Sequence, residues 1–303
     1  MSTLHPRGRI HVVHVMPDHG AFESIYADYT IAAQSHAWLS LLTPIEFEQW
    51  WPRIRLDAHV VVVLWAGRDD IGPRNERRCR VLEVYSEAFG PDWLPEHAVH
   101  FDRFRARADQ LDTFAVHTPR VAKYLYDAFG FDPILLPVGW VPRAAPTGER
   151  SGVLYFGSNA GKRAWSAPAI LGAAEHVRDV SGAFGAELRG RLEHAHAAVT
   201  LHHSDVWTTS TWRLWQIAGT GAAAIFEVGS DDTVDLWPLL PTDEAVATVP
   251  RIAPENVRLV AREIDRLAES GTLPALAARL TERLRPWTIE RCHEALVERM
   301  RLG

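Results

Sequence analysis

The stretch from Leu154 to Trp165, LYFGSNAGKRAW, combines an apolar run, two glycines and two adjacent cations. The P-loop of nucleotide hydrolases has four residues between its glycines and a Ser or Thr after its Lys. Here only three residues separate Gly157 from Gly161, and Arg163 follows Lys162. The ATPase interpretation is therefore poor. Backbone amides and two cations at a helix start nevertheless suit a diphosphate.

Two stretches in the first half place ionisable side chains directly after apolar, β-branched runs. MPDHGAFES, at the end of Ile10–Met16, supplies Asp18 and His19. WAGRDDIGPRNERR, at the end of Val60–Trp65, supplies Arg68, Asp69 and Asp70. Carboxylate and imidazole groups at strand ends are suited to general acid–base chemistry. The alternative is that they are solvated loop residues or helix caps.

Apolar runs alternate with helical patterns along the whole chain. In the first half, the predicted strands are Ile10–Met16, Val60–Trp65, Thr113–His117 and Ile134–Val138, and the predicted helices are Ala27–Leu42, Asn75–Phe89 and a helix from the Thr118 cap to Phe129. In the second half, the predicted strands are Val153–Phe156, His176–Val180, Ala198–His202 and Ala222–Phe226, and the predicted helices are Ala167–Ala174, Glu187–Ala197, Thr209–Ala218 and the tail after Pro254. This alternation predicts an α/β fold of two Rossmann-like, doubly wound domains facing a cleft, with a helical C-terminal tail.

The predicted domain boundary lies in VPRAAPTGER, which is rich in Pro and Gly and lacks periodicity. Residues 1–141 form the expected N-terminal domain, residues 142–150 the linker and residues 151–285 the C-terminal domain. Residues 286–303 are expected to form a helix that packs back towards the N-terminal domain. A chain of 303 residues is long enough for two such domains.

Composition narrows the class of protein. A hydrophobic content of 47% and a charged content of 23% are ordinary for a globular protein, and the net charge of −6 argues against a general nucleic-acid or membrane binder. Cys79 and Cys292 have no metal-binding spacing. The N-terminus lacks the apolar core of a signal peptide, and no apolar run is long enough to span a bilayer. We therefore expect a cytoplasmic protein.

A metal site is not predicted. His194, His196, His202 and His203 lie close together in the sequence but lack carboxylate or Cys partners at a known spacing. His194 and His196 fit a helix surface, and His202 fits a strand end.

The second half resembles the donor domain of the GT-B glycosyltransferases, particularly their compact bacterial and phage members. VLYFGSNAGKR is similar to their first donor-domain strand with its Gly-Ser turn and cation. VSGAFGAELRGRLEHAHAAVTLHHSDV and TSTWRLWQIAGTGAAAIFE are similar to the two strand–helix segments that follow. In the first half, FAVHTPRVAKYLYDAFGFDPILLPVGW is similar to the segment that leads across to the donor domain.

This resemblance implies a metal-independent glycosyltransferase that uses a nucleotide-sugar, most simply a UDP-sugar, as co-substrate. It implies donor contacts from Gly157, Ser158, Lys162, Arg163, His202, Arg213, Gln216, Gly221 and Glu227. Lys162 and Arg163 would neutralise the diphosphate, and Glu227 would bond sugar hydroxyls. The family commonly has Glu where this chain has Thr208 and Gln216. An amide binds a ribose diol less strongly than a carboxylate does, which leaves a catalytically silent binding protein as an alternative.

The acceptor side is expected in residues 1–141. Asp69, Asp18 and His19 are the candidates for the base that deprotonates the acceptor hydroxyl, if the configuration inverts. Arg68, Asp70, Arg74, Arg77 and Arg78 are the candidate acceptor contacts. The acceptor is a glycan, a lipid-linked sugar or a small molecule in one interpretation. In the other it is a hydroxymethylated base in phage DNA, with the arginines contacting phosphates.

Overall fold

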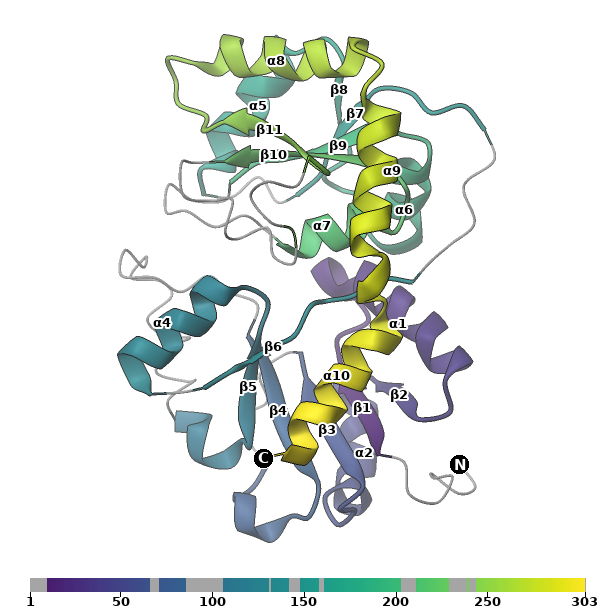
Figure 1. The fold of residues 1–303 in the computed structure, drawn as a ribbon, viewed down its shortest axis with the longest axis vertical. Coiled ribbons are helices and arrows are strands. Elements are labelled where there is room, and N and C mark those ends of the chain that lie inside the picture. Colours follow the sequence, from purple (N-terminus) through teal and green to yellow (C-terminus); the bar gives the residue numbers. More distant parts are fainter. Residues whose placement is uncertain are drawn as a thin grey trace. The chain divides into compact units, whose positions relative to one another are not determined.

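The computed structural model describes residues 10–65, 71–85, 106–130, 132–141, 148–157, 161–202, 211–228, 239 and 244–302. The chain divides into two compact units, Met1–Pro137 with Ile289–Gly303, and Val138–Thr288. We refer to them as the first and the second unit. Each is built on one parallel sheet flanked by helices, so the fold is α/β (Figure 1).

The sheet of the first unit has the strand order β2-β1-β3-β4-β5-β6, with all neighbours parallel. Its strands are β1 (His11–Val15), β2 (Leu39–Leu42), β3 (Val60–Leu64), β4 (Arg80–Tyr85), β5 (Thr113–Val116) and β6 (Ile134–Leu135). The runs HVVHV in β1 and VVVVL in β3 are buried along their whole length. Continuous β-branched runs of this kind are typical of parallel strands that are covered on both faces.

The helices of the first unit begin and end at recognisable signals. They are η1 (Gly20–Phe22), α1 (Glu23–Ser35), α2 (Pro44–Ile54), η2 (Arg74–Glu76), η4 (Ala108–Gln110), α4 (Pro119–Phe129) and α10 (Ile289–Leu302). Thr43 and Glu46 form a capping box at α2. Thr118 accepts a hydrogen bond from Val121 at the start of α4, and Gly130 ends that helix with a φ of 70°. These signals confirm the predicted helix from Thr118 to Phe129.

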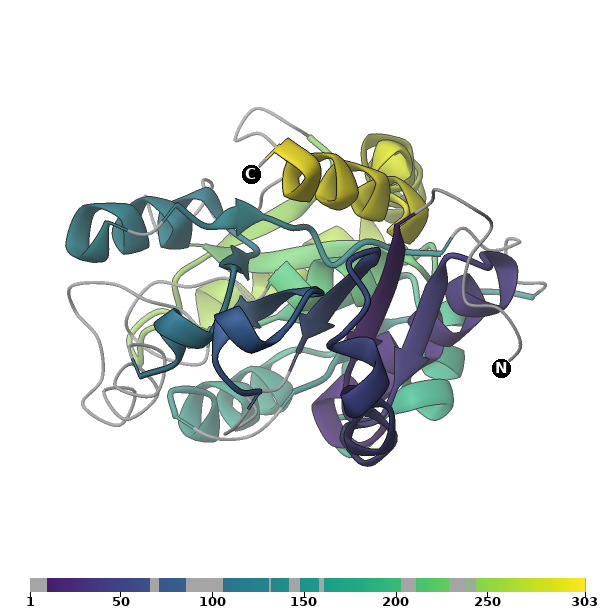
Figure 2. The same ribbon diagram turned by 90° about the horizontal axis from the view of Figure 1, so that it is seen from below.

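The C-terminal helix α10 belongs to the first unit, although the chain reaches it from the second. It lies across one face of the sheet of the first unit, where it contacts α1 (Figure 2). His293 of α10 contacts His14 of β1.

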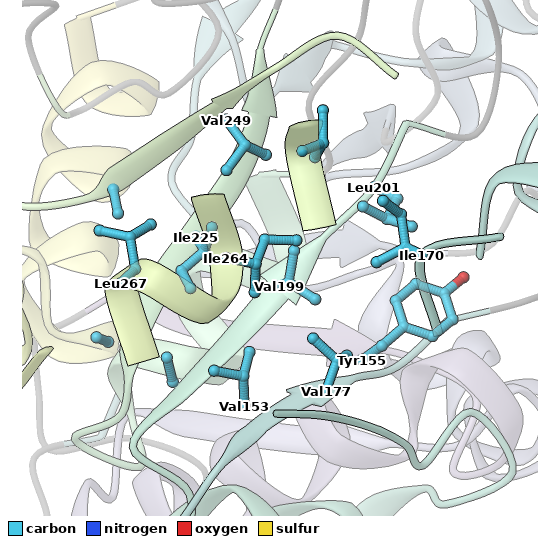
Figure 3. Packing of buried hydrophobic residues seen from close by; sticks show 14 of the residues in the cluster. Val153, Tyr155, Ile170, Val177, Val199, Leu201, Ile225, Val249, Ile264 and Leu267 are labelled. Atoms are coloured by element: carbon cyan, nitrogen blue, oxygen red, sulfur yellow. The ribbon is translucent and has the colours of Figure 1, made fainter. Parts of the chain in front are cut away.

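The sheet of the second unit has the order β11-β10-β9-β7-β8, again with all neighbours parallel. Its elements are β7 (Val153–Tyr155), α5 (Arg163–Ala173), β8 (Val177–Asp179), α6 (Gly185–Glu193), β9 (Ala197–Thr200), α7 (Thr211–Ala218), β10 (Ala223–Val228), β11 (Ala247–Pro250), α8 (Val257–Glu269), α9 (Leu273–Leu284) and η6 (Arg285–Trp287). Apolar side chains of α5 and α8 pack on Val153, Val199 and Ile225 of the sheet (Figure 3). None of the helices in the described residues is both long and apolar enough to cross a bilayer.

Two predicted helices need correction, and one strand was missed. The helix predicted at Asn75–Phe89 is wrong, because residues 80–85 form β4 between β3 and β5. The helix predicted at Ala27–Leu42 ends at Ser35, and LSLL forms the edge strand β2. The strand β11 was not predicted. Strands of four to six residues carry little periodicity of their own, so their neighbours in the sheet decide their conformation.

Candidate functional site

In the second unit, the strand order reverses at β7. The chain passes from β7 to β8 on one side and later returns to β9 on the other side. Ligands of doubly wound folds bind beyond the carboxyl ends of the strands at such a switch point. At this edge Gly157 follows β7 and His202 follows β9, so two of the predicted donor residues lie where a ligand is expected.

Arg213 is buried in the first turn of α7 and contacts the loop that follows β7. Its guanidinium carbon lies 5.5 Å from the centre of the Phe156 ring. A Cβ on Gly157 would come within 2.2 Å of Nη2 of Arg213, and Gly157 has a φ of 148°. The position therefore requires glycine, both for the backbone conformation and for the close approach of the guanidinium.

The charge of Arg213 is uncompensated among the described residues. Burial, reinforced by the charge of Arg163, lowers the pKa of Arg213 to about 9, and Tyr155 opposes the shift. Within the described part of the chain, Arg213 forms no ion pair with a carboxylate, and its Nη1 has no hydrogen-bond acceptor. A buried cation without a carboxylate partner is unfavourable, and a bound anion would reduce that cost.

Arg163 and Tyr155 interact electrostatically with each other and with Arg213. Nε of Arg163 donates a hydrogen bond of 2.9 Å to the carbonyl oxygen of Leu201, after β9. Burial lowers the pKa of Arg163, whereas Tyr155 and Glu227 raise it. Burial raises the pKa of Tyr155, which Arg213 and Arg163 oppose. The Tyr155 hydroxyl has no hydrogen-bond partner among the described residues. Tyr155 was not among the predicted donor residues, although a tyrosine two residues before Gly157 was a usable signal.

Lys162 and Glu227 were predicted to contact different parts of the donor, but they pair with each other. Nζ of Lys162 lies 2.6 Å from Oε1 of Glu227, and their side chains are 1% and 0% exposed. With Arg163 and Arg213, the cluster contains three cations and one carboxylate. Its excess positive charge suits a diphosphate.

The remaining predicted donor residues have different positions. Gln216 is half-buried in α7. Gly221 precedes β10 and therefore lies at the amino end of the sheet, away from the switch point; it makes a turn with a φ of 69° beside Arg150. Ligands of this fold bind at the opposite end of the sheet, so we no longer expect Gly221 to contact the donor. Ser158 and Thr208 lie outside the described residues.

The first unit has its own switch point, where β1 lies between β2 and β3. Asp18 and His19 follow β1 at this edge. Nδ1 of His19 lies 3.2 Å from Oδ1 of Asp18, and both side chains are exposed. The pair can orient the imidazole ring as an acid–base group. Arg68, Asp69 and Asp70 lie outside the described residues.

Three of the predicted acceptor-side arginines lie at the other end of the sheet. Arg74, Arg77 and Arg78 precede β4, at its amino end, because residues 80–85 are a strand and not a helix. Arg74 and Arg77 both pair with Asp112 at 2.9 Å, and the Arg77 side chain is only 2% exposed. Arg78 is exposed. Ligands of doubly wound sheets are not expected at this end.

The first unit also buries a neutral cluster that was not predicted from the sequence. His14, His293 and Trp65 are in contact and almost completely buried. Burial lowers the pKa of His293 to about 4 and that of His14 well below its ordinary value. The histidine in the otherwise apolar run HVVHV was the available signal. Nowhere in the described residues do three His, Cys, Asp or Glu side chains gather in a way that could hold a metal ion.

No protein-family model and no curated protein sequence matches the chain. Solved structures do match. The pneumococcal O-GlcNAc transferase GtfA, in complex with UDP and GlcNAc, has a TM-score of 0.59 and 14% identity, with coverage of 82% of this chain and 58% of that one. A mutant of S. aureus TarM, in complex with Fondaparinux, α-GlcNAc-glycerol and UDP, has a TM-score of 0.54 and 10% identity, with coverage of 83% and 57%.

A GtfA/B complex matches with a TM-score of 0.54 and 14% identity, with coverage of 85% of this chain and 60% of that one. The chain thus spans less than two thirds of the length of these proteins. At such low identity the likeness concerns the fold. The chain has the GT-B type of fold, as the resemblance in its sequence implied.

Proposed function

We propose that the protein is a nucleotide-sugar-dependent glycosyltransferase whose second unit binds the donor and whose first unit binds the acceptor. The observation that carries this proposal is the guanidinium of Arg213, which is buried against Gly157 without a carboxylate partner in the described residues. A donor diphosphate at the carboxyl ends of β7 and β9 would compensate this charge and that of Arg163.

The reaction follows from these two sides. The acceptor hydroxyl oxygen attacks the anomeric carbon of the donor sugar. The bond between that carbon and the diphosphate oxygen breaks, and the hydroxyl proton passes to a base. Asp18, His19 and Asp69 are the candidates for that base. The guanidinium groups stabilise the charge that gathers on the departing nucleoside diphosphate, so no metal ion is needed for this step.

UDP is the nucleotide to test first, because both GtfA and the TarM mutant were solved with it. We expect isothermal titration calorimetry to show binding of UDP and of a UDP-sugar. Arg213→Ala is expected to weaken both, whereas Arg191→Ala, a matched change at an exposed arginine of α6, leaves them unchanged. Absence of binding for UDP and other nucleoside diphosphates would contradict the proposal.

Two tests refine the reaction. Addition of a chelator is expected to leave sugar transfer intact, whereas loss of transfer that a divalent ion restores would point to carboxylate ligands, with Asp69 and Asp70 the first to change. The alternative of a catalytically silent sugar- or nucleotide-binding protein rests on Gln216 and Thr208. It predicts nucleotide binding without any turnover of the nucleotide-sugar, by hydrolysis or by transfer.

A further inference from the structure

Glu227 occupies an unusual place for a residue expected to bond a sugar. It is the fifth residue of β10, at the carboxyl end of the strand, and its side chain is 0% exposed. Oε1 lies 2.6 Å from Nζ of Lys162 and accepts a hydrogen bond of 2.8 Å from the backbone N–H of Ile252. Oε2 accepts one of 2.7 Å from the backbone N–H of His202.

These three bonds compensate the carboxylate within the protein. A buried carboxylate needs charge-assisted donors, and here a cation and two amides supply them. Oε2 could accept one more hydrogen bond, but the Glu227 side chain is 0% exposed, so a sugar hydroxyl would have to displace the surrounding chain to reach it. The arrangement is therefore unsuited to direct contact with the sugar.

The donors come from three different connections at the carboxyl edge of the sheet. Lys162 precedes α5, His202 follows β9 and Ile252 follows β11. The main chain of Glu227 strengthens the link to β9, because its carbonyl oxygen lies 2.7 Å from Nε2 of His202. Glu227 thus fixes the segments on both sides of the switch point relative to each other.

Arg163 lies between two of these fixed segments. Its own chain neighbour, Lys162, is held by the Glu227 carboxylate. The carbonyl of Leu201, which accepts the hydrogen bond from Nε of Arg163, precedes the His202 amide that Glu227 also holds. Two routes therefore lead from one carboxylate to the orientation of one guanidinium.

We propose that Glu227 is a positioning residue that orients Arg163 towards the donor diphosphate, through Lys162 and through the main chain at residues 201–202, and does not contact the sugar. This inference rests on the proposed function of the site. It reassigns Glu227 from the sugar to the phosphate side of the donor.

The test is Glu227→Gln, measured by calorimetry with UDP and with the UDP-sugar. A glutamine has one acceptor oxygen and an NH2 group, which would face a donor, so the three bonds cannot all persist. We expect the affinities for UDP and for the UDP-sugar to fall by the same factor, about tenfold or more. Glu187→Gln, which removes an exposed carboxylate paired with Arg191, is the matched control and leaves both affinities unchanged. A loss confined to the UDP-sugar, or no loss, overturns the inference.

A second measurement needs no ligand. In NMR spectra, the Nε–H signal of Arg163, assigned by its disappearance in Arg163→Lys, is expected to exchange slowly with water in the wild type and rapidly in Glu227→Gln. Equal protection in both proteins overturns the inference. Glu227→Asp keeps the charge but shortens the side chain, and should give the same pattern if Glu227→Gln does not fold. A wild type that binds no nucleoside diphosphate instead contradicts the proposed function, whatever the NMR result.

Discussion

The first unit buries a neutral cluster of histidine and aromatic side chains, whereas the second unit buries a cluster of charges. In the first unit, Trp65 Nε1–H donates to Nδ1 of His14, which leaves Nε2 of His14 to donate to Nε2 of His293. Nδ1 of His293 then donates to the carbonyl oxygen of Ile289. Every nitrogen in this chain has a partner when both histidines are neutral, so the tautomers follow from the bonds.

The charged cluster of the second unit is not complete in this sense. Among the described residues, Glu227 compensates Lys162, but Arg213 has no carboxylate partner and Arg163 donates to a carbonyl oxygen. The difference suggests a way to separate structural clusters from candidate binding clusters: a cluster whose donors and acceptors all pair holds the fold together, and one with surplus buried charge is a candidate anion site.

The largest effect is expected from breaking the one compensated pair in the charged cluster. Lys162→Met leaves the fully buried Glu227 without its cation, which should lower the free energy of unfolding by about 3–5 kcal/mol. Urea denaturation followed by circular dichroism measures it. Lys123→Met, at an exposed i,i+4 pair on α4, is the control and should change it by less than about 0.5 kcal/mol. A small effect of Lys162→Met would mean that the pair does not hold the edge of the sheet together.

The neutral cluster should make stability depend on pH. Because the pKa of His293 is about 4 in the folded protein and that of His14 is also lowered, the unfolded chain binds more protons between about pH 4 and 6.5. The contribution of these two histidines to the free energy of unfolding should therefore be fully present above pH 6.5. It should fall by a few kcal/mol as the pH drops towards 4.

Thermal melts across this pH range measure the effect. His293→Gln keeps an acceptor for His14 but cannot be protonated, so its profile should be flatter. His59→Gln, at an exposed turn, should retain the steep profile. Equal slopes for all three proteins would contradict a titrating buried cluster.

The uncompensated charge of Arg213 predicts a smaller effect, on ligand binding and not on stability. Arg213→Met should weaken UDP binding about 10- to 100-fold, through lost charge-assisted hydrogen bonds. The melting temperature should not fall, because the variant removes a buried cation that lacks a carboxylate in the described residues. Calorimetry and thermal melts on the same samples test both halves. A marked loss of stability with unchanged UDP affinity would place Arg213 with the structural clusters.

The smallest effect is expected at the amino end of the first sheet. Arg78 is exposed there, and its change to Glu should alter stability by less than about 0.5 kcal/mol. The same variant tests the DNA alternative in gel-shift titrations at low salt, with plain and hydroxymethylated duplexes. We expect no shift for either protein. Binding that falls steeply with salt and weakens in Arg78→Glu would restore DNA as an acceptor.

Local signals accounted for much of the fold. The β-branched runs predicted β1 and β3, and the Thr-Pro start with a glycine end predicted α4. RVLEVY in β4 was taken for helix, because its apolar residues stand at i, i+1, i+3 and i+4, the spacing of a helix. In the sheet, Glu83 of this strand pairs with Arg107 at 3.1 Å, so a charge that favoured a helix surface is accommodated in a central strand. No local pattern contains that information.

The candidate site was predictable only as a set of residues. Lys162, Arg163, Arg213 and Glu227 were all expected from the resemblance to GT-B donor domains, and the structure brings them together at the switch point of one sheet. Gly221 was expected among the donor contacts, although the predicted strand Ala222–Phe226 already placed it before the strand, at the amino end of the sheet. Which cation meets the carboxylate was not predictable.

The sequence by itself determined the alternation of strands and helices and the glycines beside the two adjacent cations, because these depend on neighbouring residues. The tertiary structure alone decided the pairing. Lys162 meets Glu227 across 65 residues and His14 meets His293 across 279, through strands and helices whose order in space is not their order in the chain. Coulomb attraction and hydrogen bonding act over a few ångströms, so the fold decides which charges are compensated and which are not.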